Sequence, residues 1–354
     1  MKKIFLVILY IVLPTGLSAQ FAFYDSINGI HWAQITPPSG EAFGHGQILR
    51  EGLGYLGSSS GAIYEYDASR PEPWRRLPQP EPYSIHEYFA LAPDDIWAAI
   101  EVPETYNRML YHWDGKEWSP SFSGNVQNIR TMFFVSSQEG WLGGEYGELW
   151  HYQRGQWQQE ELPMFIHIEK MKVLTDSALY VLCEAPAQNA LLRYHRGAWQ
   201  TVFTNVIGNL RAPVLTPSQR LLIAHDEATS VQRITSASPA TWRMPLLQME
   251  LFPNGMGYGV RNKTIYAIHD TALIPLVETP VELRGACLFN ERFSWITGAE
   301  GLILAPQTQP PATAPPPPWR TFVFRDVKLS SLYGLAILQK RAGKFSHLYC
   351  VQTA

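Results

Sequence analysis

Residues 140–157 read GWLGGEYGELWHYQRGQW, and this stretch decides the fold. Trp141 begins an apolar strand, and the following run Gly143–Gly147 places glycines where a tight turn needs positive φ. Leu149–Tyr152 alternates as a half-buried return strand does, and Trp157 closes the unit. The stretch therefore predicts a compact set of antiparallel strands.

Looser copies of this unit lie on both sides of it. They span Gly54–Trp74, Asp95–Trp118, Ala178–Trp199, Arg220–Trp242, Gly255–Leu276 and Phe293–Pro306. The closing tryptophans Trp32, Trp74, Trp118, Trp157, Trp199 and Trp242 stand 39 to 44 residues apart. A period of about 40 residues without helical apolar spacing predicts one four-stranded blade per repeat. Because a single blade cannot bury both of its faces, the copies must stack around an axis.

The sequence thus predicts an all-β chain, a seven-bladed β-propeller of four-stranded blades, with a six-bladed ring as the alternative. Seven inner segments are present, but only six closing strands follow them. Residues 31–35, HWAQI, resemble a fourth strand with no blade before it. We expect this N-terminal strand to pair with the incomplete last blade, which would leave no open edges at the joint. The region after Trp242 lacks a closing tryptophan, so it is expected to be the weakest blade.

The segment GYLGSSSGAIYEYD at 54–67, together with 140–157, resembles the repeats of two-component-regulator sensor propellers. Their pattern runs roughly Trp-x-Gly-x-x-x-Gly-Leu-x-x-Tyr. The same segments also resemble the repeats of photosystem II assembly-factor propellers. Two of the seven blades match well and the others match loosely. The first resemblance implies signal input, and the second implies scaffolding.

Residues 1–19 have the features of an export signal. Lys2 and Lys3 precede the apolar run Ile4–Val12, and small residues lead to a predicted cleavage site near Ala19. A retained N-terminal anchor is the alternative. No later stretch is apolar for long enough to span a membrane, so we expect the mature chain to be secreted, periplasmic or at the cell surface.

After the propeller, predicted to cover 20–305, the composition changes. Residues 306–318 are rich in proline and predict a semi-rigid linker. Residues 319–354 resemble the start of an FG-GAP (VCBS) repeat, with Phe-Arg-Asp-Val at 324–327. The calcium loop of that family is replaced by Leu338–Lys344, which contains no carboxylate, so no calcium site is carried over. We predict a short C-terminal β segment, a truncated module of this kind or a hairpin docked on the propeller.

The overall composition is that of a globular protein with a large core. Hydrophobic residues make up 46% of the chain and charged residues 17%, with a net charge of −3. This balance argues against non-specific binding of nucleic acid, which needs concentrated positive charge. The three cysteines are an odd number, and Cys183 and Cys287 fall in different blades, so we predict free buried thiols.

One register of the innermost strands carries polar residues. Counting back eleven residues from each blade's inner marker gives Gly44 (beside His45), His86, Arg130, Glu169, Arg211 and Arg284. If this register faces the central channel, the arginines and histidines ring one mouth and offer bidentate donors to carboxylate or phosphate. The alternative is that the arginines pair with Glu169, Glu87 or Glu250 of neighbouring strands.

The chain shows no catalytic set, no metal-ligand spacing and no cofactor motif. The histidines His112 and His151 occupy matching places in two repeats, which explains them without a metal. We therefore predict a recognition or scaffold module for a protein partner or an anionic small molecule or glycan. The longer loops Glu101–Arg108 and Glu184–Ala190 are expected to carry specificity. The alternative function is a carbohydrate-active hydrolase or lyase on the same scaffold.

Overall fold

The computed structural model describes most of the chain between residues 21 and 350. The described ranges are 21–80, 84–101, 108–122, 128–163, 167–174, 177–185, 188–206, 210–225, 228, 230–234, 240–307, 336–341 and 344–350. The predicted export signal and most of the predicted linker lie outside them.

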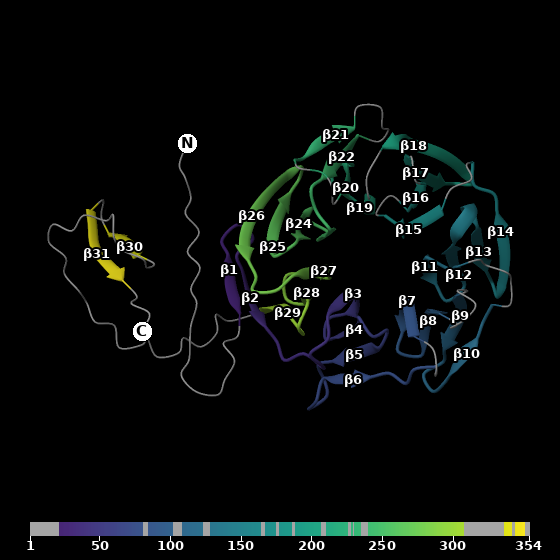
Figure 1. Cartoon of the computed structure of the whole chain (residues 1–354), viewed down its shortest axis with the longest axis horizontal. Coiled ribbons are helices and arrows are strands. Elements are labelled where there is room, and N and C mark those ends of the chain that lie inside the picture. The colour runs from purple at the N-terminus through teal and green to yellow at the C-terminus, as the bar shows by residue number, and fades with distance from the viewer. Residues whose placement is uncertain are drawn as a thin grey trace. The chain divides into compact units, whose positions relative to one another are not determined.

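The strands form seven sheets of similar size that follow one another around a ring (Figure 1). The first blade contains β3 (Phe43–Arg50), β4 (Leu53–Ser58), β5 (Ile63–Asp67) and β6 (Trp74–Arg76). The second contains β7 (Ser84–Ala92), β8 (Asp95–Glu101), β9 (Arg108–Trp113) and β10 (Trp118–Pro120). The third contains β11 (Thr131–Ser136), β12 (Glu139–Gly143), β13 (Leu149–Gln153) and β14 (Gln156–Glu160). The fourth contains β15 (His167–Val173), β16 (Leu179–Ala185), β17 (Gln188–His195) and β18 (Ala198–Val206).

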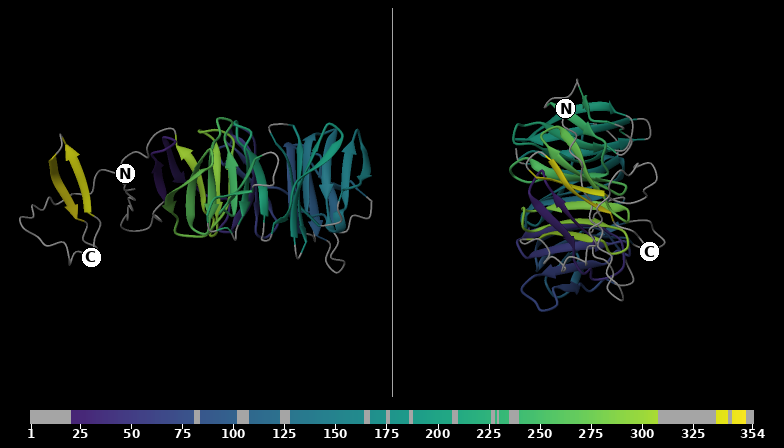
Figure 2. Two further views of the ribbon diagram at one scale, coloured as in Figure 1. Left: turned by 90° about the horizontal axis from the view of Figure 1, so that it is seen from above. Right: turned by 90° about the vertical axis from the view of Figure 1, so that its left-hand side faces the viewer.

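The remaining blades complete the circle. The fifth contains β19 (Leu210–Leu215), β20 (Leu221–His225), β21 (Gln232–Ile234) and β22 (Thr241–Met244). The sixth contains β23 (Gln248–Leu251), β24 (Met256–Arg261), β25 (Thr264–His269) and β26 (Ala272–Glu278). The seventh contains β27 (Leu283–Leu288), β28 (Ser294–Gly298) and β29 (Ile303–Gln307). The predicted seven-bladed β-propeller is confirmed, and edge-on its strands run between the two faces of the ring (Figure 2).

The N-terminal strands close the ring. β2 (Ile30–Gln34) pairs antiparallel with β29, in the register Trp32 to Pro306, so the predicted closure of the last blade is confirmed. β1 (Ala22–Asp25) then adds a fifth strand on the outside. The two ends of the propeller are thereby joined by main-chain hydrogen bonds, and the inner strands of the seventh blade have no open edge.

The fifth blade, rather than the sixth, departs from the common pattern. Its strand order is β19-β20-β22-β21, and β22 runs parallel to β20. Trp242 therefore lies in the third strand of its sheet, whereas the closing tryptophans of the first four blades lie in the outermost strand. The sixth blade keeps the common antiparallel order β23-β24-β25-β26 although no tryptophan closes it. Its outer strand pairs with β25 in an antiparallel ladder that has one register shift, between Ile265 and Tyr266.

Closing tryptophans fasten the first two blades to the connectors that enter them. Trp74 on β6 donates from Nε1 to the backbone oxygen of Thr36 at 2.9 Å. Trp118 on β10 donates in the same way to Pro78 at 2.8 Å. Each connector precedes the innermost strand of the blade that carries the tryptophan. The bond does not recur in the third blade, where the buried Nε1 of Trp157 has no acceptor, so the tryptophan period of about 40 residues reflects the repeat of the blade itself.

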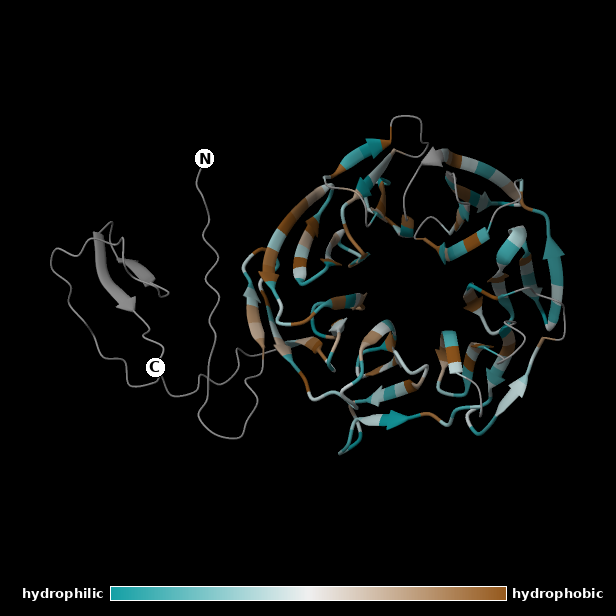
Figure 3. Ribbon diagram, in the orientation of Figure 1, coloured by the Kyte–Doolittle hydropathy of each residue, from teal (hydrophilic) through white to brown (hydrophobic). Residues whose placement is uncertain are grey.

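The hydrophobic core lies between neighbouring blades. One cluster joins Tyr55 and Ile63 of the first blade to Tyr88 and Ile96 of the second. A second joins Trp97 to Phe134 of the third blade, with ring centroids 4.5 Å apart. Apolar and polar residues alternate along many strands (Figure 3). Burial on both faces of each sheet is what makes the blades depend on one another.

Only part of the predicted glycine turn has positive φ. Gly147 has φ of 77° and Tyr146 has φ of 55°, whereas Gly143 lies within β12. A Cβ atom on Gly143 would lie 2.5 Å from the side chain of Ile168 in the next blade. This glycine is therefore required for close packing between blades rather than for turning the chain.

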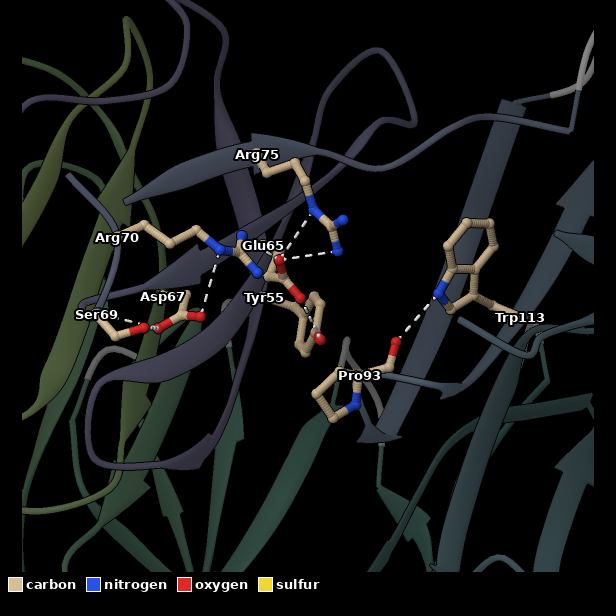
Figure 4. Close-up of polar contacts among 8 residues, drawn as sticks. All are labelled: Tyr55, Glu65, Asp67, Ser69, Arg70, Arg75, Pro93 and Trp113. Carbon is tan, nitrogen blue, oxygen red and sulfur yellow. Dashed lines mark hydrogen bonds and ion pairs between the residues drawn. The ribbon is translucent and has the colours of Figure 1, made fainter. Parts of the chain in front are cut away.

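A buried carboxylate ties three strands of the first blade together (Figure 4). Glu65 on β5 is 1% exposed and accepts a hydrogen bond from the Tyr55 hydroxyl at 3.1 Å. Its other oxygen accepts from Arg70 at 2.5 Å and from Arg75 at 3.0 Å. Two guanidinium groups thus compensate one buried charge.

The C-terminal described residues form a separate unit, the antiparallel hairpin of β30 (Ala336–Arg341) and β31 (Lys344–Cys350). The FG-GAP-like character of this tail stays a prediction, as do the linker and domain limits. Within the described part of the chain, no helix has the length and apolar character needed to cross a bilayer.

Candidate functional site

Five of the seven innermost strands carry a β-bulge near their beginning. In β7 the pairs Ile85–Ile100 and Glu87–Ala99 leave His86 as an extra residue. Glu169 in β15 and Arg284 in β27 are extra residues in the same way. The bulges of β3 and β19 each span two residues, Gly44 with His45 and Arg211 with Ala212. A bulge redirects a side chain relative to its sheet, so these side chains depart from the regular alternation.

The predicted register therefore coincides with a structural repeat. Each blade runs from its innermost strand outward and the chain then returns to the centre, so all innermost strands begin at one face of the ring (Figures 1 and 2). We call this the bulge face. Arg130 immediately precedes β11 at the same end. His45, His86, Arg130, Glu169, Arg211 and Arg284 all lie at the bulge face.

Arg130 is paired, as the alternative from sequence foresaw. Its Nη2 donates to Glu145 at 3.0 Å, and its Nη1 contacts Glu169 of the fourth blade. Glu145 also accepts from the amide of Asn128 at 2.8 Å. Burial alone would raise the pKa of Glu145, but Arg130 and Asn128 bind its ionised form and hold the pKa below its ordinary value. Arg130 therefore links two blades and is not an isolated anion receptor.

Arg284 is more open to solvent than Arg130. Its side chain is 51% exposed, and its Nη2 lies 3.8 Å from Glu282, itself 63% exposed. An ion pair as exposed as this contributes little stability, so the guanidinium can leave Glu282 at small cost. Arg211 is also exposed.

The two histidines are held mainly in their neutral forms. Burial lowers the pKa of His86, and the charge of Arg108 lowers it further. Desolvation by the surrounding blades lowers the pKa of His45, although its ring contacts solvent. At neutral pH both imidazoles can donate one hydrogen bond and accept another.

Below the bulges, ion pairs cross the inside of the ring, and sequence reasoning missed them. Lys170 on β15 contacts Glu87 of the second blade at 2.9 Å. Lys172 on the same strand contacts Glu250 of the sixth blade at 2.6 Å. Both pairs join blades that are not neighbours, so the lysine side chains must reach across the centre. The sequence did contain one signal for these pairs. Lys170 and Lys172 are two residues apart on one strand, so their side chains face the same side of it.

These cross-ring pairs carry a pH dependence that can be measured. Burial alone would raise the pKa of Glu87, but Lys170 and His45 hold it below its ordinary value of 4.5. A carboxyl whose folded pKa is depressed stabilises the fold above its unfolded pKa, and this contribution is lost as the pH falls through the folded pKa. The Glu87→Gln variant should therefore lose less stability than the wild type between about pH 5 and pH 3.

Urea unfolding at several pH values tests this expectation. Equal acid sensitivity of wild type and Glu87→Gln would show that the pair with Lys170 is not the cause.

The second cross-ring pair can be measured by itself. A double-mutant cycle of Lys172→Met and Glu250→Gln should give a coupling of about 0.5–1 kcal/mol, because both side chains are about a quarter exposed.

The carboxylates and histidines of the described residues do not assemble a metal site, since no group of three or more suitable ligands is found among them. His112 instead bonds Asp95 at 2.9 Å, and His151 stacks on Trp141 with centroids 3.6 Å apart. A general acid needs a raised pKa, whereas Glu87 and Glu145 have lowered ones. These two carboxylates therefore do not suit the role of general acid in the hydrolase alternative.

Comparison with known proteins agrees with this geometry. No model of a known protein family matches the chain, and no curated protein sequence matches it. Solved structures do match. YCF48 bound to a D1 peptide superposes with a TM-score of 0.60 at 13% identity, covering 78% of this chain and 97% of that one. The chain shares the β-propeller fold.

Two other kinds of propeller are similar to it. Virginiamycin B lyase from Staphylococcus aureus matches with a TM-score of 0.61 at 10% identity, over 78% of this chain and 99% of that one. The extracellular domain of BT4673, described as a one-component system of B. thetaiotaomicron, matches with a TM-score of 0.53 at 15% identity. That match covers 77% of this chain and only 40% of the longer one. The assembly-factor and sensor resemblances seen in the repeats are confirmed at the level of fold.

The loops predicted to carry specificity are only partly described. Residues 102–107 and 186–187 lie outside the described ranges. The strand ends that flank them, of β8 and β9 and of β16 and β17, lie at the bulge face, because they belong to the second and third strands of a blade.

Proposed function

We propose that the chain is an exported recognition module that binds a protein segment or an anionic small molecule or glycan at its bulge face. The observation that carries this proposal is the repeated bulge, which sets polar side chains of five blades around one end of the ring. Bulges are enriched next to functional sites and redirect side chains away from the ladder. A structural ring alone has no need of the same irregularity in five strands.

The exposed residues of this face suit contact with a partner. Tyr146 is 49% exposed at positive φ, and its backbone amide donates to His167 at 3.1 Å, which fixes the turn. Arg284 offers a guanidinium with only a long contact to Glu282. Aromatic and arginine side chains are the residue types enriched in interfaces. In contrast, the cross-ring ion pairs occupy the interior, so we place the ligand at the mouth.

Solved structures with the same fold support binding as the function. One of them is described as bound to a peptide, and BT4673 is represented by its extracellular domain. These descriptions belong to those proteins. They motivate a search for a partner outside the cytoplasm, consistent with the predicted export signal in residues 1–19.

A library selection followed by face-specific variants tests the proposal. Purified propeller is panned against displayed random peptides and probed on an array of anionic glycans. The Arg284→Glu and Tyr146→Ala variants should each weaken binding of the selected probe at least tenfold. The Arg292→Glu variant is the matched control, because Arg292 is an exposed arginine in the turn between β27 and β28 at the opposite face. Binding lost only in the Arg292 variant would move the site to that face and reject the proposal.

A further inference from the structure

Arg108 is a cation at the bulge face that has no carboxylate partner among the described residues. It begins β9, directly after the loop between the second and third strands of the second blade. Its Nη1 donates to the backbone oxygen of Ile129 at 3.0 Å. Its Nε is buried and has no acceptor. Within the described ranges, no carboxylate lies in ion-pair contact with Arg108, in contrast to Arg130 nearby, which contacts two.

The electrostatic surroundings of Arg108 make a guanidinium without an ion-pair partner unusual at this position. Burial lowers its pKa, Glu101 opposes that effect, and the like charge of Arg130 adds to it. A guanidinium remains charged in any protein environment, so the cost of burial cannot be relieved by losing a proton. A partly buried charge with an unused donor is expected to have a partner of opposite sign in the functional state.

We propose that Arg108 binds the oxyanion group of a ligand, a carboxylate or a phosphate. The guanidinium presents parallel N–H donors that match two oxygens of such a group, and only Nη1 is already used by the backbone. His86 is the bulged residue of β7 at the same face, and burial together with the charge of Arg108 lowers its pKa. The inference rests on the proposed function, because it names the residue that would hold an anionic group at the same face.

Glu101 is the natural competitor for this site. It is the direct cross-strand neighbour of Arg108 in the β8–β9 ladder, yet their side chains form no ion pair. Glu101 is exposed and can turn toward water. Because its charge repels an incoming anion, removing the charge should strengthen anion binding while leaving Arg108 in place.

Binding of two simple anions tests the inference without knowledge of the natural ligand. The full chain is labelled with ¹⁵N and titrated with sodium acetate and, separately, with inorganic phosphate at constant ionic strength. The side-chain N–H signals of Arg108 should move downfield on binding. A response to acetate alone assigns the site to carboxylates, and a stronger response to phosphate assigns it to phosphate groups. No movement with either anion overturns the inference, whether or not any variant folds.

Variants then identify the residue. Arg108→Gln should weaken binding of the better anion at least tenfold, and Glu101→Gln should tighten it severalfold. Arg292→Gln, which removes an exposed arginine at the opposite face, should leave it unchanged. If Arg284→Glu and Tyr146→Ala abolish binding of the selected probe while the Arg108 and Glu101 variants bind anions like the wild type, the proposed function stands and this inference fails. If the anion titration succeeds while binding of the selected probe depends on the opposite face, this inference stands and the proposed function fails.

Discussion

Removal of residues 21–34 is expected to abolish cooperative folding of the propeller. These residues supply β1 and β2, and without them the seventh blade would keep three strands with β29 as an open edge. Trp32 is 1% exposed and donates from Nε1 to the Tyr258 hydroxyl at 3.3 Å, so its loss also exposes the packing surface of the sixth blade. Circular dichroism melting should show a broad, non-cooperative transition.

A single substitution measures the same effect within the folded state. Trp32→Ala should lower the free energy of unfolding by about 3–5 kcal/mol, the range for a fully buried large aromatic residue. Trp118→Ala is the matched control, because Trp118 is a closing tryptophan that is only half-buried, and its loss should cost less. Equal costs at the two positions, measured by urea unfolding, would mean that ring closure adds nothing to ordinary packing.

A buried carboxylate strengthens this closure. Asp25 on β1 is fully buried and accepts a hydrogen bond from Tyr258 of the sixth blade at 2.5 Å. The backbone N–H groups of Ile27 and Asn28 donate to its other oxygen at 2.8 Å and 3.2 Å. The first strand after the predicted cleavage site therefore bonds to two blades at once, which explains why the chain adds a fifth strand to the last sheet.

The fold could be predicted from the sequence because it is periodic. The closing tryptophans of the first four blades all lie on the outermost strand, so their spacing reports the repeat directly. The closing role of residues 31–35 followed from a strand without a blade, and β2 occupies that place. The fifth blade keeps the tryptophan period but has a different strand order. Trp242 keeps the sequence spacing of its equivalents but lies on a strand that runs parallel to its neighbour, and spacing alone carries no information on direction.

The candidate site was predictable only in part, for a similar reason. The eleven-residue count found the bulged residues because the bulge itself repeats. Pairing does not repeat. Arg130 meets Glu169 because adjacent blades bring them together, and Lys172 meets Glu250 across the ring. Arg108 lies outside the repeat register, so no count within a blade could mark it.

The second large effect is expected at Glu65. Arg70 and Arg75 both contact its buried carboxylate, and their side chains are 36% and 51% exposed. Either arginine alone can be removed at modest cost, because the other keeps the charge compensated. Replacing both, in Arg70→Met/Arg75→Met, leaves a carboxylate that is 1% exposed without a cation. Loss of about 3 kcal/mol of unfolding free energy is expected, since an uncompensated buried charge is strongly destabilising.

The pH dependence of that double variant separates charge from packing. An unpaired buried carboxyl has a raised pKa, so the folded variant binds a proton more readily than the unfolded chain does. Stability then falls as the pH rises, and the variant should recover part of its loss when urea unfolding is repeated at pH 5 instead of pH 7. Adding Glu65→Leu should restore stability at both pH values, less about 1 kcal/mol for the hydrogen bond that Tyr55 loses. If the double variant is equally unstable at pH 5 and pH 7, the arginines stabilise the fold through the packing of their aliphatic stems and not by compensating the charge of Glu65.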